Sequence, residues 1–285
     1  MNSAPERGAP FTVVLLTCLA MLAFAANSLL TRAALQSTNI DAASFTTIRV
    51  VSGALTLFVI LRAQGGRLAA SRTGWLSALL LFTYAAAFTY AYRGIGAGAG
   101  ALVLFASAQL LMISYGLSQG ERASPWGLLL ALGGLAVFLA PSASAPAPLP
   151  AALMAVAGFA WGGFSLLGRT GGAPVASTTA SFVWAVPLAL VLLLVQGGRP
   201  RVDGAGAVYA LLSGSLTSAI GYAIWYWVRV RMTAIGAGAV QLSVPVISAV
   251  LGVLLLGEHL GVRSAVAGLA TLGGVGWVMA TVRKR

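Results

Sequence analysis

The chain has 285 residues, of which 59% are hydrophobic and only 8% are charged, and its formal net charge is +12. The low charge and a mean hydropathy of +0.93 exclude a soluble globular protein, because soluble domains carry roughly 25% charged residues. The 17 basic residues are scattered in ones, twos and threes and form no basic face, which excludes a nucleic-acid-binding protein.

Ten apolar stretches follow one another along the chain with short connections. Each is close to the roughly 20 residues that a helix needs to cross a hydrocarbon core of about 30 Å. They lack the alternation of barrel strands, and a helix satisfies its own backbone hydrogen bonds in lipid. The sequence therefore predicts an all-α integral membrane protein with ten transmembrane helices, at residues 11–31, 43–61, 74–92, 95–118, 124–141, 149–168, 175–196, 204–228, 234–257 and 262–282.

The first stretch also has features of a secretory signal peptide. Arg7 precedes an apolar run, and Ala23-Phe24-Ala25 has the small-x-small form of a cleavage site. Against cleavage, the run continues through Leu30 and its end recurs deep inside the chain. We expect this stretch to be retained as the first transmembrane helix.

Six short motifs of the first half recur in the same order in the second half, at offsets of 132 to 140 residues. Such an ordered set predicts a duplication into repeats at residues 1–142 and 143–285. Each repeat has five helices, an odd number, so the repeats are inverted, as in many secondary transporters. The motif pairs are Ser28-Leu29-Leu30 with Ser165-Leu166-Leu167, Gln64-Gly65-Gly66 with Gln196-Gly197-Gly198, Tyr84-Ala85 with Tyr222-Ala223, IGAGA at 95–99 with IGAGA at 235–239, Gly120-Glu121 with Gly257-Glu258, and Leu132-Gly133-Gly134 with Leu272-Gly273-Gly274.

The basic residues are distributed unevenly between the two sides of the membrane. If the N-terminus is cytoplasmic, 11 of them fall on the inner side, 5 fall on the outer side, and Arg49 falls within a helix. By the positive-inside rule, this distribution favours two cytoplasmic termini.

The IGAGA motif begins the fourth and ninth predicted helices and places Gly96, Gly98, Gly236 and Gly238 at their starts. Glycines let two helix backbones approach closely, and they also loosen a helix. These glycines therefore either serve packing alone or form a hinge and gate that moves during transport. Pro245 is assigned to the hinge, because proline removes a backbone hydrogen bond from the ninth helix.

Along its whole length the sequence resembles the EamA-type transporters of the drug/metabolite transporter superfamily. The resemblance rests on the two repeats, Asn27 in the first helix, Arg49 in the second, the small-residue starts of the fourth and ninth helices, and the Gly-Glu pairs. Residues 240–246 followed by Leu256-Gly257-Glu258 are especially similar to the second EamA repeat. The resemblance implies a multi-pass carrier in the bacterial inner membrane, often an exporter of amino acids or other small metabolites. The first repeat lacks the proline common in its fourth helix, so the substrate class does not transfer.

Four polar side chains inside the apolar stretches are candidate substrate ligands. Arg49 either binds a carboxylate or phosphate of the substrate, or it extends to the membrane surface or bonds backbone carbonyls near the outer end of its helix. Gln241 is the strongest amide candidate, because it lies one turn before Pro245, whose ring can leave a carbonyl free for a ligand. Alternatively, Gln241, Asn27 and Gln109 hydrogen-bond between helices.

Several aromatic residues are candidates for the wall of a substrate cavity. Tyr84 and Tyr222 occupy equivalent positions in the two repeats. Tyr90 lies in the same predicted helix as Tyr84, Trp225 lies in the same helix as Tyr222, and Trp161 lies in the sixth helix. Aromatic walls suit amphipathic organic substrates, including cations. For Trp161, packing against lipid is an equal alternative.

Acidic residues lie at the ends of the predicted helices. Glu121 and Glu258 each precede a helix and are expected to cap it, or to form a salt bridge at a gate. Asp41 and Asp203 lie in loops. With no acid at mid-membrane, we expect a facilitator or exchanger rather than a proton-driven carrier.

An enzyme is not expected. The single histidine, His259, lies in a loop without other metal-ligating residues at suitable spacing, and the chain has neither a phosphate-binding loop nor a Ser/His/Asp set. We therefore predict a secondary carrier whose partners are a small organic molecule and the bilayer, with no metal or cofactor. A membrane scaffold or a lipid-handling, scramblase-like protein is the alternative. The sequence leaves a monomer and a homodimer both open.

Overall fold

The computed structural model describes residues 10–68, 74–95, 97–139, 147–167, 174–256 and 261–284. Eight of the described segments are helices long and apolar enough to cross a membrane, and Val103–Ser118 and Pro125–Phe138 are shorter apolar helices. The chain is an all-α, multi-pass membrane protein. Its elements are α1 (Pro10–Ser37), α2 (Ala42–Ala63), α3 (Gly74–Ala91), α4 (Ala97–Ser118), β1 (Glu121–Arg122), α5 (Pro125–Leu139), α6 (Pro148–Leu167), α7 (Pro174–Val195), α8 (Gly204–Leu212), η2 (Ser213–Ile220), α9 (Gly221–Arg229), α10 (Ala234–Gln241), α11 (Ser243–Leu256), α12 (Val262–Thr281) and β2 (Arg283–Lys284).

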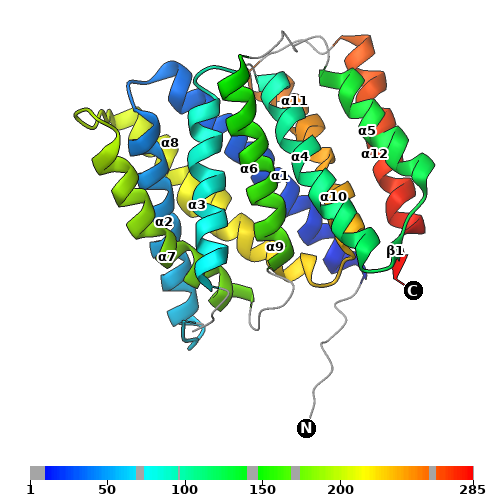
Figure 1. Cartoon of the computed structure of the whole chain (residues 1–285), viewed down its shortest axis with the longest axis horizontal. Coiled ribbons are helices and arrows are strands. Elements are labelled where there is room, and N and C mark those ends of the chain that lie inside the picture. The colour runs from blue at the N-terminus through cyan, green and yellow to red at the C-terminus, as the bar shows by residue number, and fades with distance from the viewer. Residues whose placement is uncertain are drawn as a thin grey trace.

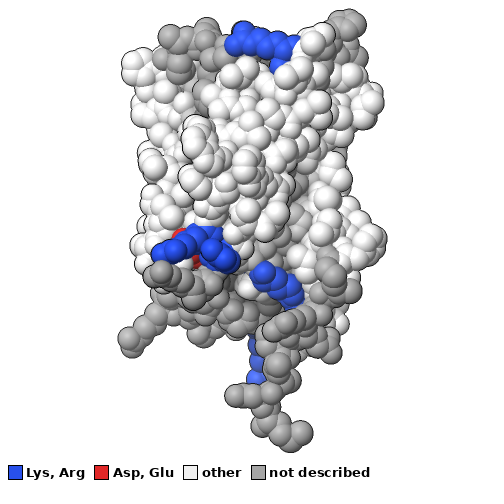
Figure 2. All heavy atoms as spheres, turned by 90° about the vertical axis from the view of Figure 1, so that its right-hand side faces the viewer, with Lys and Arg blue, Asp and Glu red and all other residues white. Residues whose placement is uncertain are grey.

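The helices lie side by side, and successive membrane-crossing segments run in alternating directions (Figure 1). The start of α1 and the strand β2 lie at the same end of the bundle, where β2 pairs antiparallel with β1. Figure 2 shows the face formed by α5 and α12, on which basic residues gather at the two ends and leave an uncharged band between them. Such a band suits the hydrocarbon core, which excludes charged side chains.

Helix boundaries follow local signals in the sequence. Asp41 accepts a hydrogen bond from the Ser44 amide at the start of α2, and Asp203 accepts one from the Gly206 amide at the start of α8. At the ends of α2, α4 and α7 the backbone of Gly65, Gly120 and Gly197 has positive φ, which glycine adopts without steric cost. The repeated Gln-Gly-Gly motif therefore serves as a helix C-terminal signal in both halves.

Two stretches that were predicted as single helices are interrupted, and α1 is longer than expected. The segment from Gly204 to Arg229 contains eight π-helical residues, η2, between α8 and α9. The next segment breaks between α10 and α11 because Pro245 has no amide hydrogen to donate to the carbonyl of Gln241. Helix α1 continues six residues beyond the predicted end at residue 31. The length of an apolar stretch reflects the thickness of the membrane, and a helix can continue beyond the membrane.

The two halves of the chain interdigitate. Helix α6 packs on α3 and α4, while α1 packs on η2, α9 and α11. Helix α2 packs on α7 and on η2, α3 packs on α7, α4 packs on α10, and α5 packs on α12. Neither half therefore buries its helices without the other.

Glycines allow several of these close approaches. A Cβ on Gly158 of α6 would overlap the carbonyl oxygen of Leu104 on α4, and one on Gly274 of α12 would overlap the backbone of Ala131 on α5. One on Gly238 would overlap the amide oxygen of Gln109. Unlike the contacts of Gly158 and Gly274, this one is with the end of a flexible side chain and not with a helix backbone, so it does not distinguish the two roles expected for the IGAGA glycines.

Candidate functional site

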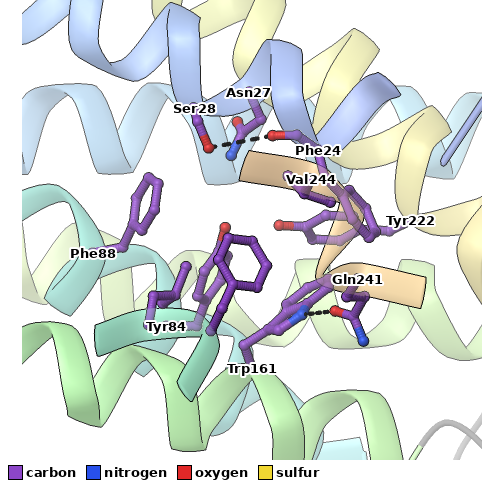
Figure 3. Close-up of a pocket in the computed structure, with 11 residues that line it drawn as sticks. Phe24, Asn27, Ser28, Tyr84, Phe88, Trp161, Tyr222, Gln241 and Val244 are labelled. Atoms are coloured by element: carbon purple, nitrogen blue, oxygen red, sulfur yellow. Dashed lines mark hydrogen bonds between the residues drawn. The ribbon is translucent and has the colours of Figure 1, made fainter. Parts of the chain in front are cut away.

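A small cavity lies between the two halves of the chain (Figure 3). Helices α1, α3 and α4 of the first half and α6, α9, α10 and α11 of the second half contribute its walls. Of the predicted ligands, five lie here: Asn27, Tyr84, Trp161, Tyr222 and Gln241. The other lining residues are Phe24, Ser28, Phe88, Leu104, Phe105 and Val244.

The cavity has a volume of about 30 Å³, which is room for a water molecule or two. Ligand pockets for organic molecules have volumes of roughly 300 Å³ or more. A substrate therefore enters only if the helices around the cavity move apart.

Arg49 lies behind two of the cavity's tyrosines and is only 2% exposed. Its Nη2 donates to the hydroxyl of Tyr222 at 3.0 Å and to that of Tyr84 at 3.5 Å, and its Nε donates to Ser218 Oγ at 3.1 Å. The guanidinium carbon lies 5.3 Å from the centroid of the Tyr84 ring. The interpretation that Arg49 extends to the membrane surface is wrong, because its partners are side chains buried inside the bundle.

Asn27 connects α1 to the π-helical segment. Its Oδ1 accepts hydrogen bonds from Ser213 Oγ at 2.7 Å and from Thr217 Oγ1 at 3.2 Å. Short π-helical segments are frequent at functional sites. Here η2 supplies partners both to Asn27 and, through Ser218, to Arg49.

Gln241 lies at the break between α10 and α11. Its Oε1 accepts a short hydrogen bond from Trp161 Nε1, and its Nε2 donates to the carbonyl of Ala237 at 2.9 Å. The bond to Trp161 joins α10 to α6 across the cavity wall (Figure 3). The alternative of interhelical hydrogen bonding therefore applies to Gln241, at the edge of the cavity.

Aromatic rings form most of the cavity wall. The Trp161 centroid lies 5.0 Å from that of Tyr222, 5.1 Å from that of Tyr84 and 5.2 Å from that of Phe24. Rings at these separations attract one another in tilted and edge-to-face arrangements. The wall therefore presents apolar ring faces together with two phenolic hydroxyls.

Besides Arg49, three predicted ligands do not line the cavity. Trp225 is buried behind it, with its ring centroid 5.7 Å from that of Phe24. Tyr90 is half-buried near the end of α3, and Gln109 faces Gly238 on α10. Gln109 packs against another helix, but its Oε1 and Nε2 are buried without a hydrogen-bond partner, so the structure does not show the interhelical hydrogen bond that was the alternative for this residue.

The predicted hinge and cap residues are distributed over several helix ends. Gly98 lies in the first turn of α4, Gly236 lies in α10, and the buried Pro245 lies in the first turn of α11, where a missing amide hydrogen costs least. Gly96 and Glu258 lie outside the described residues.

Glu121 caps a different helix from the one expected. Its carboxylate is 1% exposed and accepts hydrogen bonds from the amides of Ala234 at 2.8 Å and Ile235 at 2.9 Å, at the start of α10. The predicted partner was α5, but Ser124 Oγ accepts from the Gly127 amide there. The prediction was wrong because β1 directs Glu121 toward the other half of the chain, where the N-terminus of α10 favours an anion.

Sequence reasoning missed six of the lining residues. Phe88 lies one turn after Tyr84, Val244 lies one turn after Gln241, and Phe24 lies one turn before Asn27, so a spacing of three or four residues from each candidate indicates them. Ser28 follows Asn27 directly. Phe105 lies one turn before the candidate Gln109, but Leu104 has no such signal, because apolar residues surround it on α4.

A second, polar cavity of about 240 Å³ lies where α1 meets α2. Arg93 and Arg201 line it together with Asp41, whose Oδ2 accepts from the Arg201 amide at 2.6 Å. Burial by itself raises the pKa of Asp41, but hydrogen bonds from Arg201, Ser44 and Ala43 outweigh it and lower the pKa below 3.8. Among the described residues, no group of three His, Cys, Asp or Glu could hold a metal ion.

Comparisons with known proteins agree with this architecture. A family described as the EamA-like transporter family matches residues 149–280. An uncharacterized protein of Pseudomonas aeruginosa is 52% identical over 270 residues, which cover 94% of each chain. A solved structure, described only as the crystal structure of a protein, has a TM-score of 0.79 at 18% identity and covers 95% of this chain and 98% of its own. This last similarity shows the fold alone.

Proposed function

Because the chain belongs to the EamA-like transporter family, as the resemblance implied, we propose that it is a secondary carrier of a small organic solute such as an amino acid or a related metabolite. It works by alternating access between two inverted five-helix repeats. The natural direction is export across a bacterial inner membrane, with both termini in the cytoplasm.

The cavity between the two halves is the observation that carries this proposal. Substrate sites of carriers built from inverted repeats lie near the middle of the membrane, between the repeats and beside interrupted helices. Here both halves line the cavity, and the break between α10 and α11 adjoins Gln241 in its wall. The small volume of the cavity suits a conformation that closes around its site between openings to the two sides.

The pattern of helix packing supports the inverted repeats. Let α1 to α5 correspond in order to α6, α7, the segment α8–α9, the segment α10–α11 and α12. Each main helix–helix contact between the halves then has a counterpart. The contacts of α6 with α3 and α4 correspond to those of α1 with α9 and α11. The contact of α3 with α7 corresponds to that of α2 with η2, and the pairs α2–α7, α4–α10 and α5–α12 correspond to themselves.

The proposed orientation has a direct test. A reporter that is active only in the cytoplasm, fused after the last residue, is expected to be active, while a truncation after α11 places it outside and inactivates it. The reverse pattern contradicts the orientation.

The carrier is further proposed to use the gradient of its own substrate. Within the described part of the chain, the acidic residues Asp41, Glu121 and Asp203 are hydrogen-bonded to helix N-termini. None of them lines the cavity. Proton coupling needs a titratable group whose protonation changes the transport cycle, and these carboxylates already have a structural role.

Counterflow in proteoliposomes tests the carrier function. Vesicles loaded with unlabelled solute should take up labelled solute transiently and saturably, and Trp161→Ala should reduce this uptake. Trp184→Ala is the matched control, because Trp184 lies on the outer face of α7 and stacks with Trp75 rather than lining the cavity. Lipid transfer without solute flux would instead establish the scramblase-like alternative.

A further inference from the structure

The charge of Arg49 has no acidic partner in the described part of the chain. Its hydrogen-bond partners are the hydroxyls of Ser218, Tyr84 and Tyr222, and its Nη1 is buried without a partner. A buried charge without a counterion is costly, by several kcal/mol after relaxation. An anion that enters the neighbouring cavity offsets this cost.

The two tyrosine hydroxyls connect this charge to the cavity. Each accepts a hydrogen bond from Arg49 Nη2, and both rings line the cavity. In Figure 3 the phenolic oxygen of Tyr222 points toward the centre of the cavity and toward Tyr84. A hydroxyl that accepts from a guanidinium is polarised as a donor, so an anion in the cavity meets donors with a positive charge behind them.

The remaining groups of the cavity do not suit a cation. The lining residues include no acid. Asn27 Oδ1 already accepts from Ser213 and Thr217, and Gln241 Oε1 already accepts from Trp161. An ammonium group would therefore meet only neutral acceptors and the faces of aromatic rings, without a carboxylate to balance its charge, and it would be repelled by Arg49.

From this geometry we infer that the solute is a monoanionic organic carboxylate with an apolar or aromatic body and no ammonium group. The carboxylate lies against the hydroxyls of Tyr84 and Tyr222 with Arg49 behind them, and the body lies among Phe24, Phe88 and Trp161. One guanidinium balances one negative charge, whereas a phosphate dianion would leave an uncompensated charge in a water-poor site. This inference rests on the proposed carrier function, since it assigns the substrate class of the same site, and among the solutes proposed above it selects related metabolites without an ammonium group over amino acids.

Binding of matched compounds to the purified full-length protein tests the inference. 3-Phenylpropionate, phenylalanine and 3-phenylpropylamine share a phenyl ring and a three-carbon chain but differ in charge, and phenyl phosphate supplies a dianion. We expect 3-phenylpropionate to raise the melting temperature in a dose-dependent way, with a Kd at least about tenfold lower than those of the other three. Equal or tighter binding of any of the other three, or no binding of 3-phenylpropionate, would overturn the inference.

Variants assign the effect to Arg49. Arg49→Gln should weaken 3-phenylpropionate binding by about 10- to 100-fold, the value of a charged hydrogen bond. Arg62→Gln should leave it unchanged, because Arg62 is exposed in the last turn of the same helix. Tyr84→Phe combined with Tyr222→Phe keeps the rings and Arg49, so it tests the hydroxyls if Arg49→Gln does not fold. Undiminished binding in a folded Arg49→Gln protein, or in the double variant, would overturn the inference.

Measurements of solute transport in proteoliposomes distinguish a failure of this inference from a failure of the carrier proposal. Export of a monoanion moves one charge, so a voltage of 100 mV, worth about 2.3 kcal/mol per charge, should sustain a gradient of about 50-fold. Charge-selective binding without counterflow refutes the carrier function and leaves the assigned anion site. Counterflow of phenylalanine or the amine with no binding of 3-phenylpropionate refutes the anion assignment and leaves the carrier.

Discussion

Replacing Glu121 with glutamine removes the negative charge at the start of α10 while it keeps the size of the side chain. The carboxylate accepts from two buried amides, Ala234 N and Ile235 N, whereas glutamine has one acceptor oxygen and turns an NH2 group toward the second amide. Loss of one charged hydrogen bond costs about 1.5–3 kcal/mol, and loss of the interaction with the helix dipole typically costs about 0.3–1 kcal/mol. We therefore expect a destabilisation of about 2–4 kcal/mol.

A destabilisation of this size lowers the melting temperature by about 4–16 °C, at about 2–4 °C per kcal/mol for a large domain. It is measured by thermal unfolding of the detergent-solubilised protein. The matched control is Asp203→Asn, because asparagine is as good an N-cap as aspartate and Asp203 has a single backbone partner at 3.2 Å. If Glu121→Gln melts within 2 °C of wild type, roughly the shift for 1 kcal/mol, the carboxylate does not hold α10 in the way its geometry indicates.

Three further predictions concern packing, transport and pH. Gly274→Ala should lower the melting temperature, because its Cβ would overlap the backbone of Ala131, while Gly273→Ala, which meets nothing within 4 Å, should leave it equal or raise it. Gln241→Ala and Tyr222→Ala should each reduce transport per folded molecule more than they reduce expression, whereas Glu258→Gln should leave substrate affinity little changed. If both alanine variants transport as much per folded molecule as wild type, the two residues do not belong to the site. Since the pKa of Asp41 lies below 3.8 in the folded protein, its stabilising effect is complete above the unfolded value and is lost as the pH falls through the folded one. The melting-temperature difference between wild type and Asp41→Asn should therefore be constant from about pH 5 to 8 and shrink below about pH 3.8, and a difference that varies across the neutral range would contradict this.

Each predicted apolar stretch contains a helix of the structure, and most of the predicted helix ends agree, for local reasons. A helix satisfies its own backbone hydrogen bonds, so apolar length and terminal residues such as Asp41 and Gly65 mark where it lies. The interruption before Pro245 also has a local cause. The sequence did not predict that the helix ends before this proline, because a proline indicates where a hydrogen bond is lost but not whether the helix bends or ends.

Much of the candidate site could be named in advance because polar and repeated aromatic residues are rare enough in an apolar helix to stand out. Asn27, Tyr84, Trp161, Tyr222 and Gln241 were all found in this way and all line the cavity. Their partners could not be found, since Arg49 bonds residues 35 to 173 positions away in the chain. Glu121 likewise caps a helix that begins 113 positions later.

The sequence by itself determined where the long apolar helices lie, that the two halves of the chain share motifs and which side chains are chemically unusual. Only the tertiary structure decided which face of each helix meets the cavity. The physical reason is that lipid is as apolar as the protein interior, so composition does not separate an inward face from an outward one. Trp161 and Trp184 illustrate this: both lie in apolar helices, yet Trp161 is 5% exposed in the cavity wall and Trp184 is 42% exposed on the outer surface.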